Sequence, residues 1–154
     1  MQGTWRPTLD QSILGAHLSP ANLSALVEVG RWLEYEAGTY LFREGERNHD
    51  VFFVLEGRVD LSMTVPGRGP CRILTLGAGD VVAWSAVVRD GTMSCSTRCI
   101  DNVKLFAVSC TDLEAMTEAD ARFGHEFMRM MATALAKRLL ATRLQLLDLF
   151  AHQV

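Results

Sequence analysis

The sequence lacks the apolar runs that mark membrane and secreted proteins. No apolar stretch approaches the roughly 20 residues that a transmembrane helix needs. The N-terminal segment, which carries Trp5, Arg6 and Asp10, has no apolar core of the kind found in a signal peptide. We therefore expect a cytoplasmic protein that makes no contact with a membrane.

An excess of positive charge is also missing. The 154 residues carry 15 Lys and Arg against 18 Asp and Glu, which gives a formal net charge of -3. Because nucleic-acid affinity depends largely on Lys and Arg neutralising phosphates, we expect no direct binding to nucleic acid.

The usual motifs of catalysis and metal binding are absent. The four cysteines form no CxxC pair, the four histidines are scattered, and no HExxH, P-loop or Gly-x-Ser-x-Gly sequence occurs. An iron–sulfur cluster would need clustered cysteines, and none precedes Cys71. We expect no enzyme activity, no metal and no tightly held cofactor, with the cysteines reduced and partly buried.

What the chain does have is the composition of one globular domain, with 49% hydrophobic and 21% charged residues. We expect residues 1–154 to form a single domain. Leu9–Leu14 is predicted to form a short helix. A second helix is predicted over 17–30, because Ser19-Pro20 is a typical N-cap and first-turn pair and Gly30 is a typical terminator.

From Trp32 the hydrophobic period changes toward two, which is typical of strands. Short segments rich in aromatic and β-branched residues, bounded by turn residues, continue to about residue 109. Pro66–Pro70 is expected to be a loop. Many short strands at regular spacing predict a mainly β fold, a sandwich or a β-roll with flanking helices.

The last part, 111–150, is predicted to be helical. Thr111-Asp112-Leu113-Glu114 has the form of a capping box for a helix that ends near Met116 or Thr117, and a long helix should run from about Asp120 to Phe150. Alternating spacings of four and three produce a coiled-coil-like seam: Met128, Ala132, Leu135, Leu139, Thr142, Leu146 and Leu149. A flanking set broadens the apolar surface: Phe127, Met131, Ala134, Leu140, Leu144 and Leu147. The helix either packs back on the roll or pairs in parallel with a second copy.

Three stretches resemble the cyclic nucleotide-binding domain family, the sensor of bacterial catabolite-activator and FNR-type regulators. They are Y-E-A-G-T-Y-L-F-R-E-G-E, V-F-F-V-L-E-G-R-V-D-L and the segment Gly77–Arg98, which is similar to the family's phosphate-binding cassette. The resemblance covers about 17–150. It implies a jelly-roll-like β-roll (double-stranded β-helix) over 32–109, a ligand-sensing role and a homodimer through the long helix. The family usually continues into a DNA-binding domain, which we do not expect here because the chain ends at Val154.

The resemblance also assigns a ligand pocket, at Gly79, Ala83, Trp84, Ser85, Ala86, Met93, Ser94 and Cys95. The family's ribose-binding glutamate falls on Trp84 and its phosphate-binding arginine on Met93. Arg89 is an alternative phosphate contact, and Thr142 matches a threonine that touches the base in the family. Arg98 matches a second, structural arginine. The pocket therefore looks degenerate, with Trp84 either filling it or forming an aromatic wall for another ligand.

Three functions remain open from the sequence. The first is a stand-alone sensor domain that does not bind cAMP in the usual way and regulates a partner protein as a homodimer. In it, a ligand at Ala83–Ala86 and Ser94 would shift the cassette against the long helix. The second is a cAMP or cGMP receptor with a rewired phosphate contact, and the third is a ligand-free interaction module.

Overall fold

The computed structural model describes residues 13–88 and 90–152, so Arg89 and residues 9–12 of the expected first helix lie outside the described residues. The elements follow one another in this order: α1 (Ile13–His17), α2 (Pro20–Val29), β1 (Arg31–Tyr35), β2 (Tyr40–Phe42), β3 (Asp50–Glu56), β4 (Val59–Val65), β5 (Gly69–Leu76), β6 (Val81–Val82), α3 (Ser85–Val88), β7 (Ser96–Cys99), β8 (Val103–Ser109), α4 (Cys110–Ala119) and α5 (Ala121–Ala151).

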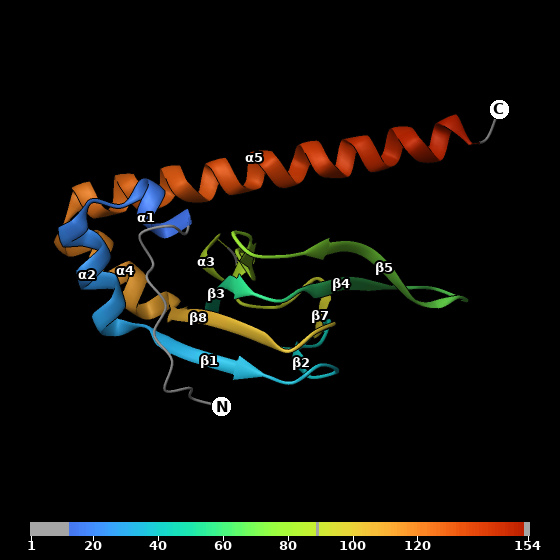
Figure 1. Ribbon diagram of the computed structural model, residues 1–154, viewed down its shortest axis with the longest axis horizontal. Helices are drawn as coiled ribbons and strands as arrows, with labels where there is room; N and C mark the ends of the chain where they lie inside the picture. The colour runs from blue at the N-terminus through green and yellow to red at the C-terminus, as the bar shows by residue number, and fades with distance from the viewer. Residues whose placement is uncertain (1–12, 89, 153–154) are drawn as a thin grey trace.

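The strands form two antiparallel four-stranded sheets, in the orders β1-β8-β3-β6 and β2-β7-β4-β5. Strands far apart in the sequence are neighbours in each sheet, and the sheets enclose an apolar core. The expected mainly β fold, a β-roll with N-terminal helices and a long C-terminal helix, is confirmed (Figure 1).

The ends of α2 follow the predicted signals, although the helix begins at Pro20 and His17 belongs to the separate helix α1. The Ser19 hydroxyl accepts from the Asn22 amide and Pro20 opens α2, while the Gly30 amide closes it on the Leu26 carbonyl. Gly30 has a second role, because a Cβ at this position would lie 2.0 Å from the Phe106 ring. Only glycine lets the chain enter β1 so close to the core.

Three local expectations were wrong. The N-cap of α4 is Ser109, whose hydroxyl accepts from the Asp112 amide at 3.1 Å, so the helix begins before Thr111 and runs on to Ala119. The loop at 66–70 is shorter than expected, because Gly69 and Pro70 already pair with β4. Pro70 has no amide proton to donate, and it is tolerated there because β5 is an edge strand that pairs on one side only.

The long helix α5 has two environments along its length. Its first turns pack on α1, α4 and the roll, and Phe123, Phe127, Met130 and Met131 are buried. The Phe127 ring lies edge-on to Phe53 in the core, at 6.5 Å between centroids. The later turns run above the β4–β5 hairpin in the view of Figure 1 and are exposed almost throughout. Packing back on the roll therefore describes only the first part of the helix.

Candidate functional site

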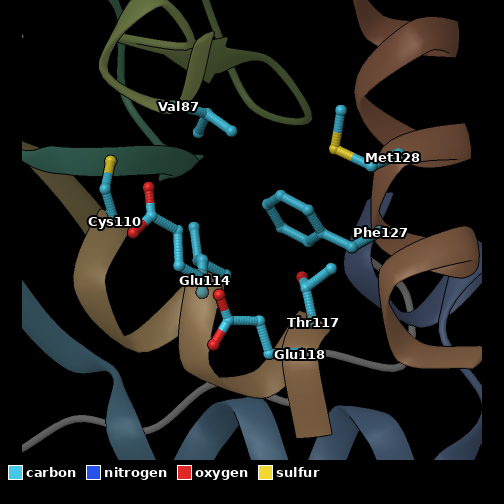
Figure 2. A pocket seen from close by; sticks show the side chains of 8 residues that line it. Val87, Cys110, Glu114, Thr117, Glu118, Phe127 and Met128 are labelled. Atoms are coloured by element: carbon cyan, nitrogen blue, oxygen red, sulfur yellow. The ribbon is translucent and has the colours of Figure 1, made fainter. Parts of the chain in front are cut away.

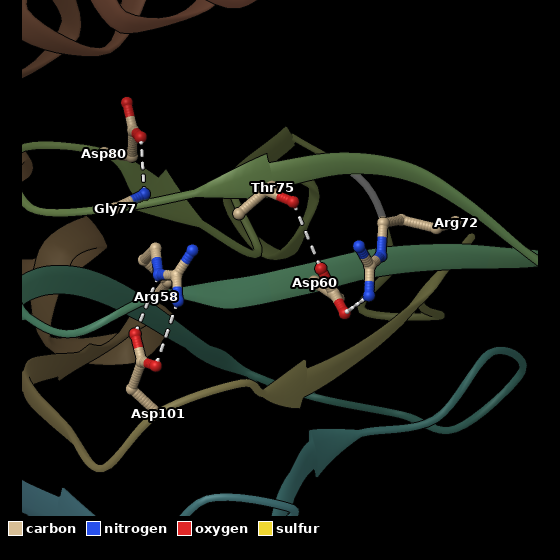
Figure 3. A network of polar contacts seen from close by, with 7 residues as sticks. All are labelled: Arg58, Asp60, Arg72, Thr75, Gly77, Asp80 and Asp101. Carbon is tan, nitrogen blue, oxygen red and sulfur yellow. Dashed lines mark hydrogen bonds and ion pairs between the residues drawn. The ribbon is translucent and has the colours of Figure 1, made fainter.

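The cassette-equivalent segment is held against the middle of the roll. The Gly79 amide donates to the Val54 carbonyl at 2.9 Å, and the Val54 amide donates to the Asp80 carbonyl at 3.0 Å. The Asp80 carboxylate in turn accepts from the Gly77 amide at 2.9 Å, which closes the corner before β6 (Figure 3). These bonds fix where the chain leaves β5 and where α3 begins.

Ala83 joins β6 to α3 in a left-handed conformation, with φ of 66°. This conformation costs a residue with a Cβ about 1–2 kcal/mol, and strained backbone of this kind is concentrated at functional and switch regions. Ala83 is buried, as are Ser85 and Ala86 behind it. The sequence carried no signal of this strain, because alanine has no preference for a positive φ.

Met93 occupies the position at which the resemblance places a phosphate-binding arginine. Its side chain is 2% exposed. The sulfur lies 4.0 Å from the Ser85 hydroxyl and 3.8 Å from Nδ2 of Asn48, which both point donors at it. The Met93 backbone exchanges hydrogen bonds with Gly45 and Glu46, at 2.8 and 2.9 Å. A neutral, packed thioether therefore stands at the position to which the resemblance assigns an arginine.

The other cassette side chains divide between core and solvent. Trp84 is half-buried and packs on the hydrophobic core, and Cys95 is also half-buried. Ser94 is exposed and lines a cavity of about 570 Å³ together with Asp90, Thr92 and Met93. Of the predicted positions, Ser85 contacts the Met93 sulfur and Ser94 shares the cavity with Met93.

A residue that the sequence analysis missed approaches the same segment from the far end of the chain. Arg138, on α5, donates a hydrogen bond from Nη2 to the carbonyl oxygen of Val81 in β6. Thr142, one turn later, is exposed and donates to the Arg138 carbonyl instead. The signal that could have found Arg138 is its place in the helix, three residues after the half-buried Leu135 on the side that faces the roll.

Burial shapes the titration of Arg138 and of three cysteines. Burial lowers the pKa of Arg138, while the charges of Asp80 and Cys95 act in the opposite direction. Burial also raises the pKa of the Cys95 thiol, against smaller opposite effects of Arg138 and of a hydrogen bond with Thr97. Cys99 and Cys110 have their pKa raised to about 11 by burial, so they remain thiols at neutral pH.

A second hollow lies beside α3. A cavity of about 520 Å³ opens between α3, α4 and α5. Val87, Phe127 and Met128 form its apolar side, and the carboxylates of Glu114 and Glu118 lie on the opposite side (Figure 2). This hollow separates the cassette helix from the first half of α5.

The remaining polar contacts near the cassette stabilise the strands and corners. Arg58 pairs through two hydrogen bonds with Asp101, and Arg72 pairs with Asp60, which also accepts from Thr75 across the β4–β5 hairpin (Figure 3). The Arg58–Asp101 pair is largely exposed and contributes little to stability, whereas Asp60 is mostly buried beside Arg72. Within residues 13–88 and 90–152, no group of three or more His, Cys, Asp or Glu side chains is placed to hold a metal ion.

Comparison with known proteins identifies the family to which this roll and cassette belong. The sequence pattern described as the cyclic nucleotide-binding domain matches residues 32–120. The chain belongs to this family. The match begins in β1 and ends at the N-cap of α5, so it contains every strand of the roll and the cassette-equivalent segment.

Individual relatives agree with this assignment. Cyclic nucleotide-gated ion channel 18 of Arabidopsis thaliana is 32% identical over 110 residues, which are 64% of this chain but only 14% of the channel. A cyclic nucleotide-binding domain from Methylobacillus flagellatus has the same fold, with a TM-score of 0.78 and 19% identity over 85% of this chain and 74% of that one. The catabolite activator protein of Thermus thermophilus follows with a TM-score of 0.70 and 24% identity, over 91% and 63%.

The family is that of a regulatory sensor domain, and this chain has its fold. None of the described helices, including the 31-residue α5, has the length and hydropathy of a membrane-spanning segment. The chain spans a small part of the plant channel that it matches.

Proposed function

We propose that the protein is a sensor domain that does not bind cAMP in the family's usual way and that regulates a partner protein as a homodimer. The observation that carries the first part is the buried Met93 at the position of the phosphate-binding arginine. A charge-assisted hydrogen bond contributes about 1.5–3 kcal/mol, so its loss lowers affinity by roughly one to two powers of ten.

The environment of Met93 supports this reading of the pocket. Its sulfur is in contact with Ser85 and Asn48, so the side chain fills the space in which a phosphate would meet the cassette. Trp84, at the position of the ribose-binding glutamate, packs on the core and offers no carboxylate. Both polar contacts that hold a cyclic nucleotide in the family are thus replaced by apolar groups.

The second part of the proposal rests on the exposed half of α5. Leu139, Leu146 and Leu149, members of the predicted seam, are 51%, 53% and 62% exposed, and Met128 begins the same stripe. Leu135 is half-buried. An apolar stripe at coiled-coil spacing fits a second copy of the same helix. Movement of the cassette against α5 would then be transmitted to the helix pair and its partner protein.

Isothermal titration calorimetry with cAMP and cGMP tests the pocket. We expect no heat from the wild type at micromolar concentrations and binding by the Trp84→Glu/Met93→Arg double variant. Met63→Arg is the matched control, because it adds the same charge at an exposed methionine of β4, and it should not bind. A folded double variant that still fails to bind would contradict the proposal that these two positions removed the nucleotide site.

A receptor with a rewired phosphate contact is the second candidate. It is favoured by the cavity of about 570 Å³ beside Met93 and Ser94 and by the approach of the Arg138 guanidinium to β6. It predicts saturable quenching of tryptophan fluorescence by cAMP or cGMP, lost in Trp84→Phe. The third alternative is a ligand-free interaction module. It would be supported if neither the wild type nor any variant binds a nucleotide while the protein still dimerises and binds its partner.

A further inference from the structure

The cavity of about 520 Å³ beside α3 has charge of one sign only. Its described lining includes two carboxylates, those of Glu114 and Glu118, and no Lys, Arg or His side chain. Neither glutamate forms a salt bridge with any described residue. Both belong to α4, whose ten residues carry acidic side chains but no basic one. The negative charge of the cavity therefore has no counter-charge among the described residues that line it.

The place of the two carboxylates on α4 strengthens their attraction for a cation. Glu114 and Glu118 are four residues apart, so they lie on the same side of the helix and repel each other. Glu118 is also in the last turn of the helix, where the free backbone carbonyls carry partial negative charge. A cation bound between the two carboxylates would relieve both unfavourable interactions.

The rest of the cavity is apolar and has a firm wall. α4 and α5 touch where Thr117 meets Gly124, since a Cβ on this glycine would lie 2.6 Å from the threonine Cγ2. The cavity extends from Thr117 to Val87 of α3, and Phe127 points into it (Figure 2). Leu113 and Phe127 belong to the buried core, so packing fixes their positions. Small-molecule pockets usually have volumes of about 300–1,000 Å³, a range that includes this cavity.

We propose that this cavity binds a small organic cation, a protonated amine that carries an alkyl or aromatic body. The ammonium group lies between Glu114 and Glu118, and the apolar body packs on Phe127 and Val87. Enclosure by three helices favours a free amine over a side chain of a partner protein. The cavity shares no described lining residue with the pocket that the resemblance assigns. The proposal therefore goes beyond the sensor function and does not depend on nucleotide binding.

NMR of the full chain, labelled with ¹³C at the methionine methyl groups, tests the site. Met128 lines the cavity, whereas Met63 is exposed on β4 and serves as the internal reference; Met128→Leu and Met63→Leu assign the two resonances. The probes are n-hexylammonium and phenethylammonium at constant ionic strength. Both should shift the Met128 resonance saturably and leave that of Met63 unchanged. Ethylammonium has the charge without the apolar body and should bind weaker by about tenfold or more.

Substitution of the carboxylates separates the charge from the apolar wall. Glu114→Gln together with Glu118→Gln changes exposed positions only, so the variant should remain folded. Its affinity for the two amines should fall by about three- to tenfold, whereas its affinity for neutral 1-hexanol should not change. Glu28→Gln together with Glu36→Gln is the matched control, because it removes the same charge from exposed residues outside the cavity lining. It should bind the amines as the wild type does.

Two results would overturn the inference. One is a Met128 resonance that neither amine shifts, and the other is equal affinity for the amines in the wild type and in the Glu114→Gln/Glu118→Gln variant. A blocked tripeptide with a central lysine is the third probe. If it shifts Met128 while the free amines do not, the cavity is a docking site for a partner protein and the small-molecule proposal is wrong. The loss of the usual cassette contacts is tested separately, by the Trp84→Glu/Met93→Arg variant.

Discussion

The two halves of α5 have similar apolar content and opposite environments. In the first, Phe123, Phe127, Met130 and Met131 are buried against the roll and α4. In the second, Leu147 and Phe150 are 63% and 60% exposed. Packing against the roll therefore explains the apolar residues of the first half of the helix only. The second half has an apolar surface that nothing else in the described chain covers, and that surface is available for association.

The largest expected effect is on the anchored half. Phe127→Ala removes a ring that packs on Phe53 and Phe123, and should lower the free energy of unfolding by about 3–5 kcal/mol. Urea unfolding measured below the concentration at which the protein associates is the appropriate readout. The same truncation in the other half, Phe150→Ala, should leave that free energy unchanged, and equal losses in both variants would abolish the contrast.

Charge in the exposed half is the next test. Leu139→Glu together with Leu146→Glu places carboxylates on the proposed helix seam, where burial without a partner is costly. We expect association to weaken by about two powers of ten, from a loss near 3 kcal/mol, with the monomer still folded. Light scattering coupled to gel filtration measures the molar mass. Glu substitutions at the solvent-facing Thr133 and Ala141 are the control, and a wild type that is monomeric at every concentration would contradict the homodimer.

The attachment of the first half to α2 should depend on pH. Glu126 accepts from Nδ2 of Asn22 at 2.7 Å and from the Ser19 amide at 3.0 Å. Two hydrogen bonds hold the pKa of Glu126 below its ordinary value of 4.5, and the bond from Asn22 has a larger effect than the bond from Ser19. The stabilisation is therefore present above pH 4.5 and is lost as the pH falls through the lower pKa of the folded state.

The unfolding midpoint measured between pH 3 and pH 7 should accordingly fall less steeply on acidification in Glu126→Gln than in the wild type. Asp148→Asn is the matched variant in the exposed half and should keep the wild-type profile. Identical profiles for all three proteins would show that the contact between α5 and α2 contributes nothing to the acid sensitivity.

The smallest expected effect lies in the roll, outside both halves of the helix. Ala83→Gly relieves the left-handed backbone before α3, and the gain of about 1–2 kcal/mol is partly offset by the greater freedom of glycine in the unfolded chain. We expect a net stabilisation of about 0.5–1 kcal/mol by urea unfolding. Ala86→Gly, inside α3, should destabilise instead. A loss of stability in Ala83→Gly would mean that the alanine methyl group contributes more by packing than its conformation costs.

Much of the fold could be predicted because its signals are local. Ser19, Pro20 and Gly30 set the ends of α2 by capping and backbone preference, and the period of the apolar residues indicated the strands. Errors arose where two local signals competed. Ser109 and Thr111 are each followed, three residues later, by an acidic residue, so either could be the N-cap of α4. The hydrogen bond from the Asp112 amide to the Ser109 hydroxyl shows that Ser109 is the N-cap.

The candidate site was predicted only in part. The sequence assigns Met93 and Trp84 to the cassette-equivalent segment from the residues around them, because that segment is continuous, and this assignment stays a prediction. Arg138 could not be placed in this way, since the residue whose carbonyl it contacts is 57 positions away in the chain. The burial of Phe123 and Met130 was missed for the same reason: the stripe they form with Phe127 is one of two apolar stripes on α5, and the sequence does not say which one faces the roll.

The sequence by itself determined the order of helices and strands and most of the corners between them, since each depends on residues close together in the chain. Tertiary structure alone decided which stripe of α5 is buried, that Met93 is packed against Ser85 and Asn48, and that an arginine of the last helix reaches β6. These outcomes depend on how the roll closes, because closure brings distant segments together and removes particular side chains from water.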